Sequence, residues 1–384
     1  MPATGAARTQ DSLRDAWLLS TIFAATGAGM ALPGAILPAL MRQWSLEDSG
    51  AGLLLFLAWL GSSTGALAAG SHRRSVTAGG CLAVAAALAA MAMGSAQLRF
   101  VEMFVYGLGL GAAMTAISLV QAERHAHDSG REMNRLNMIW ALGAVVCPVL
   151  AAHSLRVASP RAICGGLAAV FALLGLLALR PAAAEVGQPW TSPVPGATSG
   201  WRSMWPLALV LLAFLPTGIE STMGGWVTEY AQRQQQSIAT SVAAGSLFWG
   251  GILVSRACSA TRLLAWRTEH KVLLQSVWTI LAGVLLLVML PNQFGILCGN
   301  ALVGFGLGPV YPLALALALR HRDHPGIFWI AGLGSALLPW ITGMASSLGH
   351  SLRLGLLVPL AAAVVLVVSG LAVPVVAPAS DIRS

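Results

Sequence analysis

Residues 214–230 read FLPTGIESTMGGWVTEY, and they lie inside a long apolar segment that begins near Pro206. One acid, Glu220, stands in the middle of this segment. On insertion scales, a charged side chain at the centre of a bilayer costs about 2.5 to 3.5 kcal/mol, so such a residue usually faces a cavity or a partner. The sequence around Glu220 therefore predicts a membrane helix that borders a polar interior.

The composition of the whole chain agrees with this prediction. Of the 384 residues, 57% are hydrophobic and only 9% are charged, and the mean hydropathy is +0.75. Soluble domains carry roughly 25% charged residues. Apolar runs of about 20 residues, each long enough to cross a hydrocarbon core of roughly 30 Å, recur along the chain. We therefore expect an all-α membrane protein with almost no soluble domain.

Twelve of these apolar runs are long enough to be transmembrane helices. A polar linker at 180–203, rich in Pro, Gly and Ser, separates six runs from six. We therefore expect an N-terminal six-helix bundle at 1–179 and a C-terminal six-helix bundle at 204–384. The expected helices are 16–40, 50–70, 76–96, 100–121, 133–153, 161–179, 205–230, 239–258, 270–290, 294–318, 326–348 and 354–376.

The basic residues predict how the chain crosses the membrane. If both termini are cytoplasmic, sixteen of the 22 Lys and Arg residues fall on the cytoplasmic side, and Arg256 is counted among them. The positive-inside rule then places both termini in the cytoplasm of a multi-pass inner-membrane protein. This topology also explains the net charge of +8, so we do not expect nucleic acid as a partner.

Two patterns recur in the two halves of the chain. The fourth run contains GLGLG at 107–111, and the tenth contains GFGLG at 304–308. Gly143 in the fifth run and Gly334 in the eleventh each stand five residues before a proline. Such matches are typical of two pseudo-symmetric bundles in a parallel repeat, with a substrate site near the midplane between them.

Further motifs carry a family resemblance. They are RLN at 135–137, E-x-x-x-G-G-W-x-x-x-Y at 220–230, SLFWGG followed by Arg256, GFGLGPVYP in the tenth run and GSALLPWITG in the eleventh. In this order they resemble the major facilitator superfamily, and more narrowly its fucose permease-like branch of sugar–proton symporters. The resemblance implies alternating access around a central site, with protons as the coupling ion.

The loop after the second run departs from the pattern of that family. The family usually reads G-x-L-x-D-R-x-G-R-R, whereas this chain reads GALAAGSHRR, with Ala69 in place of the acid. The resemblance implies that Arg73 and Arg74 belong to the cytoplasmic gate. The branch also carries acids in its first and fourth runs, but here the first run has no interior acid and Met114 stands near the fourth-run position. Proton coupling therefore does not follow from the resemblance alone.

Glu220 is the main candidate for the site. It could bind a proton or accept hydrogen bonds from substrate hydroxyls, and the structural alternative is an acid held by Ser, Thr or Arg of a neighbouring helix. Two other acids, Glu102 near Arg99 and Glu229, are expected in contact with water at the outer surface. The expected cavity-lining residues are Asn137, Trp140, Trp226, Asn300 and Tyr311.

The sequence does not favour an enzyme. The pattern G-x-S-x-G at 61–65 lies within an apolar run, without the strand-to-helix turn that a hydrolase nucleophile requires. No H-E-x-x-H is present, and no Cys and His residues have the spacing of a zinc site. We therefore expect no catalytic residues, no metal and no cofactor, and we expect the five cysteines to be reduced and structural.

These observations favour a monomeric secondary transporter in a lipid bilayer. Its substrate is expected to be a small molecule, a sugar or a related polyhydroxylated compound, moved together with protons. Two alternatives stay open. An efflux pump for amphipathic or drug-like compounds would fit the thirteen tryptophans and the sparse polar residues, and it would be favoured by fewer than three polar side chains at the midplane. A non-transporting sensor or assembly protein would show no cavity between the bundles.

Overall fold

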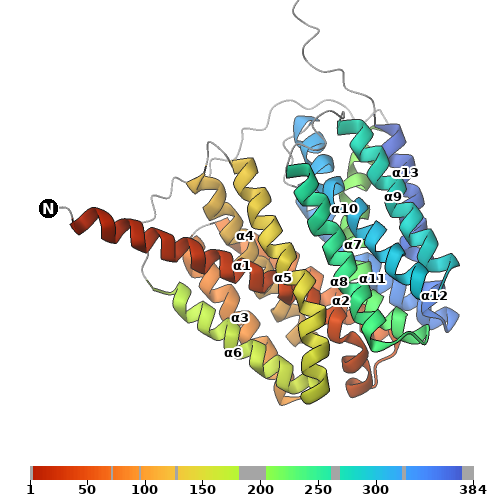
Figure 1. Ribbon diagram of the computed structural model, residues 1–384, viewed down its shortest axis with the longest axis horizontal. Helices are drawn as coiled ribbons and strands as arrows, with labels where there is room; N and C mark the ends of the chain where they lie inside the picture. Colours follow the sequence, from red (N-terminus) through yellow and green to blue (C-terminus); the bar gives the residue numbers. More distant parts are fainter. Residues whose placement is uncertain are drawn as a thin grey trace, which may run out of the picture.

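The computed structural model describes residues 3–70, 72–94, 97–125, 129–180, 205–260, 269–321 and 326–373, and every element within these ranges is a helix (Figure 1). All twelve predicted runs are found as helices, most of them longer than the apolar run itself. The first half contains α1 (Ala3–Trp44), α2 (Asp48–Ala66), η1 (Leu67–Gly70), α3 (Arg73–Met93), α4 (Arg99–Arg124), α5 (Ser129–Val157) and α6 (Pro160–Ala178). The second half contains α7 (Trp205–Arg233), α8 (Ile238–Ala260), α9 (Glu269–Met289), α10 (Gln293–His321), α11 (Gly326–Gly349), α12 (Leu352–Gly355) and α13 (Leu357–Ala372).

The lengths and compositions of the helices fit a bilayer. Within the described ranges, eleven helical segments are long and apolar enough to span a membrane. The remaining long helix, α11, has 24 residues and includes glycines, serines and a threonine. It packs between α2 and α7, so this helix contributes small side chains to the interior of the protein. The chain is therefore a multi-pass membrane protein of twelve long helices.

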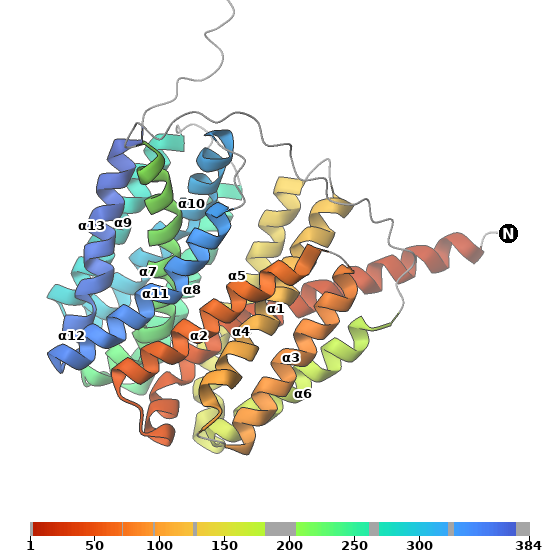
Figure 2. The ribbon, with the colours of Figure 1, turned by 180° about the vertical axis from the view of Figure 1, so that it is seen from behind.

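The helices form two bundles, α1–α6 and α7–α13, which lie side by side in Figures 1 and 2. In the first bundle α4 packs on α2 and α3, α3 packs on α6, and α1 packs on α5. In the second bundle α10 packs on α8 and α9, α13 packs on α9, and α11 packs on α7. Each contact in one bundle thus has its equivalent in the other, as the predicted internal repeat requires.

The repeated glycines make these equivalent contacts. A Cβ atom at Gly107 of α4 would overlap the carbonyl oxygen of Ala58 in α2, and one at Gly304 of α10 would overlap that of Phe248 in α8. A Cβ atom at Gly143 of α5 would likewise overlap a backbone carbonyl oxygen of α1, and one at Gly334 of α11 would overlap a carbonyl oxygen of α7. Because lipid is as apolar as the helices, close backbone approach through small residues is a main source of helix association in membranes. The sequence repeat is therefore a repeat of packing sites.

In the described part of the chain, the main contacts between the two bundles are those of α2 with α11, α5 with α8, and α1 with α7. We call the side where α6 ends and α7 begins the linker face, and the opposite side the distal face. The positive-inside rule predicts that the linker face is cytoplasmic. Toward the distal face the bundles converge, and the first turns of α2 lie against α11 (Figure 2).

The repeat of packing sites leads to a first prediction. Gly107→Val and Gly304→Val should each destabilise the protein by about 1 to 3 kcal/mol, because the added side chain forces two tightly packed backbones apart. Gly166→Val is the matched control, since Gly166 is also in a membrane helix but a Cβ there would meet no atom within 4 Å. Thermal unfolding in detergent measures the effect. Equal melting temperatures for all three variants would contradict the packing role.

Candidate functional site

Glu220 lies midway along α7, on a segment that is firmly attached to α11. The hydroxyl of Thr217 donates to the carbonyl oxygen of Ala331 at 2.7 Å, and that of Ser221 donates to the carbonyl oxygen of Ser335 at 2.7 Å. These bonds fix the rotation of α7 about its axis. Gly224, which shares a face with Glu220, then meets the ring of Trp249 in α8.

The charge partner of Glu220 is Arg256 of α8. The two side chains interact electrostatically, and both are partly exposed. Among the described residues, however, neither takes part in a hydrogen bond or in an ion pair within 4.0 Å. The carboxylate and the guanidinium therefore attract each other without touching.

Arg256 also contacts the N-terminal bundle. Its guanidinium carbon lies 5.9 Å from the ring centroid of Trp140 in α5, a cation–π arrangement. Trp140 in turn meets the ring of Trp249 edge-on, with centroids 5.5 Å apart and planes at 78°. The indole Nε1 of Trp140 is buried and has no hydrogen-bond partner among the described residues. We call Glu220, Arg256, Trp140 and Trp249 the charge–indole cluster.

The charge–indole cluster spans both bundles, because Trp140 comes from α5 while the other three residues come from α7 and α8. It contains an acceptor and a cationic donor, an indole N–H without a partner among the described residues, and two buried indole rings. Arg256, counted above among the cytoplasmic basic residues, lies within α8, inside the helix predicted at 239–258. In the sequence, Arg256 follows Trp249 by seven residues, which is about two helical turns. This spacing indicates that both side chains lie on one face of α8.

The other predicted site residues lie in different surroundings. Asn137 is partly exposed on α5, one turn before Trp140. Trp226 is completely buried, and its Nε1 donates to the carbonyl oxygen of Pro339 at 3.0 Å, which ties α7 to α11. Asn300 is also completely buried: its Nδ2 donates to Ile296 of its own helix at 2.7 Å, while its Oδ1 has no partner among the described residues. The side chain of Tyr311 lies outside the described residues.

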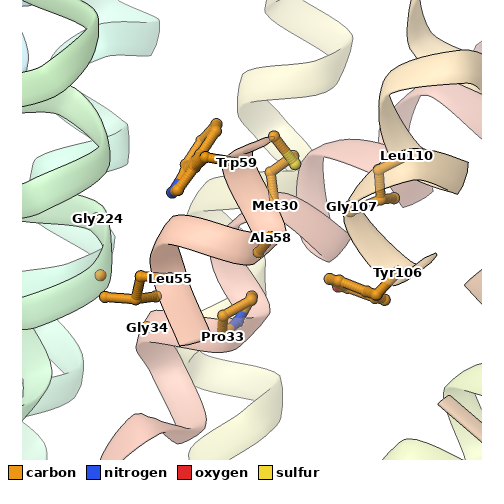
Figure 3. A pocket seen from close by; sticks show the side chains of 11 residues that line it. Met30, Pro33, Gly34, Leu55, Ala58, Trp59, Tyr106, Gly107, Leu110 and Gly224 are labelled. Atoms are coloured by element: carbon orange, nitrogen blue, oxygen red, sulfur yellow. The ribbon is translucent and has the colours of Figure 1, made fainter. Parts of the chain in front are cut away.

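A small pocket adjoins the cluster between α1, α2, α4 and α7 (Figure 3). Gly224 is shared, because it lines this pocket and also contacts Trp249 of the cluster. The hydroxyl of Tyr106 donates to the carbonyl oxygen of Gly29 at 2.5 Å, so its polar atom is already used. The pocket is thus mainly apolar. Its lining residues are Met30, Pro33, Gly34, Leu55, Ala58, Trp59, Tyr106, Gly107, Leu110, Gly224 and Gly225.

Charged residues join the two bundles at the distal face. Arg233 of α7 binds both carboxylate oxygens of Asp48 in α2, at 2.7 and 2.5 Å, and also binds Glu229 at 2.6 Å. Ser346 of α11 donates to Asp48 at 2.5 Å. We call Asp48, Glu229, Arg233 and Ser346 the distal latch, because it holds α2 against α7 and α11.

Two acids that were expected in contact with water are buried. Glu229 is only 9% exposed, because the four-residue spacing on α7 brings Arg233 onto it. Glu102, in the first turn of α4, is only 5% exposed, and neither of its carboxylate oxygens has a hydrogen-bond partner among the described residues. Both predictions of surface position are therefore wrong.

The two predicted gate arginines form contacts within the N-terminal bundle. Arg73 pairs with Glu123 of α4, and Arg74 binds Asp15 of α1 at 2.5 Å and the carbonyl oxygen of Ala178 at 3.0 Å. Asp15 also binds Arg124 of α4 at 2.5 Å. The contacts of these arginines in the described part of the chain hold α1, α3, α4 and α6 together at the linker face. Asp15 thus supplies an acid for Arg74 and Arg124, and Glu123 supplies one for Arg73, where Ala69 cannot.

The distal latch leads to a second prediction. Asp48→Asn should destabilise the closed conformation of the distal face, relative to the open one, by about 2 kcal/mol, because Arg233 loses its bidentate partner across the bundles. The equilibrium then shifts about 30-fold toward the open conformation. Spin labels at Glu47 and Ala239, both exposed at the distal face, report the opening as a longer inter-label distance. Glu132→Gln is the control, since it removes an ion pair with Arg135 that lies within α5. Unchanged distances in Asp48→Asn would contradict the latch.

Comparisons with known proteins agree with this architecture. Solved structures of similar fold include nucleoside transporter NupG, with 14% identity and a TM-score of 0.69 over 95% of this chain and 97% of that one. The D323A mutant of NupG has 14% identity and a TM-score of 0.70, over 92% of this chain and 99% of that one. A bacterial homologue of the human drug peptide transporters PepT1 and PepT2 has 14% identity and a TM-score of 0.70, with 95% and 97% covered. No curated protein matches the sequence. The family model described as Major Facilitator Superfamily matches residues 18–327, so the chain belongs to that superfamily.

Proposed function

We propose that this protein is a proton-coupled transporter of a small polyhydroxylated solute, a sugar or a related compound. The substrate would bind at the charge–indole cluster and cross by alternating access of the two bundles around it. One observation carries the proposal: Glu220 and Arg256 of the C-terminal bundle attract each other without contact, beside an indole N–H of the N-terminal bundle that has no partner among the described residues.

The chemistry of the cluster suits hydroxyl groups. A hydroxyl donates one hydrogen bond and accepts others, so neighbouring hydroxyls can bridge the protonated carboxyl group of Glu220 and the guanidinium of Arg256. A further oxygen can accept from Nε1 of Trp140, which otherwise stays unsatisfied at a cost of about 1 to 3 kcal/mol. The face of a sugar ring can stack on an indole. These features together support a polyhydroxylated substrate, and NupG, which shares the fold, is named a nucleoside transporter.

The same acid supports proton coupling. Glu220 is partly exposed, and no contact with a cation holds it in the charged form. When it is protonated, its attraction for Arg256 disappears, and Arg256 is free to bind the substrate more strongly. When it is ionised, substrate and carboxylate compete for the guanidinium. A proton and a substrate would thus favour each other's binding, which is the requirement for symport.

A specific observation favours a second candidate function. The pocket beside Gly224 is lined by apolar side chains such as Met30, Leu55 and Leu110, together with Trp59. Such a lining favours apolar ligand groups, although the pocket is small in this structure and would have to widen to admit a large one. Export of amphipathic compounds is therefore the alternative, with the apolar part in this pocket and a polar group at Glu220.

A third prediction separates these functions. In proteoliposomes, one member of a panel of monosaccharides, polyols and nucleosides should accumulate when an inward proton gradient is imposed, and a fluorescent amphipathic cation should not. Glu220→Gln should reduce the stimulation by the gradient about tenfold, while exchange of substrate without a gradient continues. The control is Glu47→Gln, an exposed acid. Transport of the amphipathic cation alone would favour the second candidate, and full coupling in Glu220→Gln would refute the role of this acid.

A fourth prediction concerns Trp140. Trp140→Phe keeps an aromatic ring but removes the N–H group, so binding of the transported solute should weaken about fivefold, which corresponds to one hydrogen bond of about 1 kcal/mol. Trp278→Phe makes the same change on α9, where the side chain is 52% exposed, and should have no effect. Substrate binding measured by tryptophan fluorescence or calorimetry gives both values. Equal affinities of the two variants for the solute would contradict a role of Trp140 in substrate binding.

A further inference from the structure

The charge–indole cluster contains one positive and one negative charge, both at membrane depth. Arg256 lies within the membrane-spanning segment Ile238–Cys258 of α8, and Glu220 lies within Leu207–Arg233 of α7. Each is the electrostatic partner of the other. The ring of Trp140 adds only the weaker attraction of an aromatic face for a cation. Glu220 is therefore the counter-ion of Arg256 in the described part of the chain.

The other acids on the neighbouring helices already have basic partners. Arg256 is the one charged residue of α8, which packs on α5, α7 and α10. From α7, Glu229 is held by Arg233 in the distal latch. From α5, Glu132 pairs with Arg135 at 3.7 Å. The described side chains of α10 include no charged residue. The charge balance of the cluster thus depends on the protonation of a single acid.

Protonation of Glu220 changes the net charge of the cluster from zero to one positive charge. The proposed transport cycle passes through this state, because the proton and the substrate favour each other's binding. A cation without a counter-ion is costly inside a membrane protein. A neutral solute can accept hydrogen bonds from the guanidinium of Arg256, but it leaves the charge unbalanced. A solute with one negative charge balances it.

A carboxylate is the anionic group that fits this position. An arginine binds a carboxylate through two parallel hydrogen bonds. A phosphate ester carries nearly two negative charges near neutral pH, and Arg256 is the only cation of the described residues that interacts with Glu220. The protonated Glu220 and the indole N–H of Trp140 are hydrogen-bond donors. Such donors suit the hydroxyl and ring oxygens of a sugar.

We propose that the substrate is a sugar acid, a polyhydroxylated compound with one carboxylate, and that this carboxylate replaces Glu220 as the counter-ion of Arg256. The inference rests on the proposed function, since it specifies which polyhydroxylated solute the same site accepts. Arg256 then selects the charge of the substrate, while Glu220 carries the proton. One proton and one anion cross together, so transport moves no net charge.

Matched pairs of sugars test the selection of charge. Binding of glucose, galactose and mannose to the purified protein is compared with binding of their uronates, which carry a carboxylate in place of the terminal hydroxymethyl group. One uronate should bind about 30-fold more tightly than its parent sugar, as hydrogen bonds between charged groups allow. Arg256→Gln should abolish this preference, whereas Arg256→Lys should keep part of it, because lysine retains the charge but not the two parallel bonds. The control Arg135→Gln, at an exposed arginine, should keep all of it.

Uptake by the wild type in proteoliposomes tests the charge balance without any variant. Uronate uptake should respond to a pH gradient but not to a membrane potential set with potassium and valinomycin. Proton-driven accumulation of a neutral sugar above that of its uronate would overturn the inference and leave the proposed function standing. So would a uronate preference that persists in Arg256→Gln. Absence of proton-driven uptake for every sugar, uronate, polyol and nucleoside would instead contradict the proposed function, and this inference with it.

Discussion

Close contact between helix backbones through glycine is the constraint on which this structure depends. In a membrane the helices gain little from burying apolar side chains, so they associate where small residues let the backbones approach. Gly107 and Gly304 bring α4 onto α2 and α10 onto α8. Gly34 of α1 meets the backbone of α7 at Gly224, and Gly224 in turn leaves room for the ring of Trp249. The same kind of contact thus builds each bundle and positions part of the charge–indole cluster.

Within this packing, the described charges fall into two groups. The charged residues of the distal latch form several short hydrogen bonds and ion pairs, and so do the charged residues around Asp15 at the linker face. Their role is to hold helices together. Glu220, Arg256 and Glu102 have no such contacts among the described residues. Placing a charge in a membrane helix is costly, and an unpaired charge stabilises nothing. The proposed binding of substrate and proton would account for Glu220 and Arg256.

The sequence predicted the fold well because its signals are local. Apolar runs give the helices, and the glycine patterns at 107–111 and 304–308 give the repeat. The site was predicted only in part. Glu220 and Trp140 do lie in one cluster, but Arg256, inside the helix predicted at 239–258, was counted only as a cytoplasmic charge and not as a site residue. Glu102 and Glu229 were placed at the surface because they lie near helix ends. Whether a charge near a helix end is buried depends on neighbouring helices, which a single sequence does not show.

The connection between the distal latch and the transport site follows from the rigidity of α7. This helix carries Glu220 and, thirteen residues later, Arg233 of the latch, a separation of about 20 Å along its axis. Thr217, Ser221 and Trp226 bind it to the backbone of α11, which carries Ser346. The helices α7 and α11 are therefore bonded to each other at three levels and must move together against α2. Opening the latch in this arrangement is a rotation of one bundle against the other, and it must also change how Glu220 and Arg256 face Trp140.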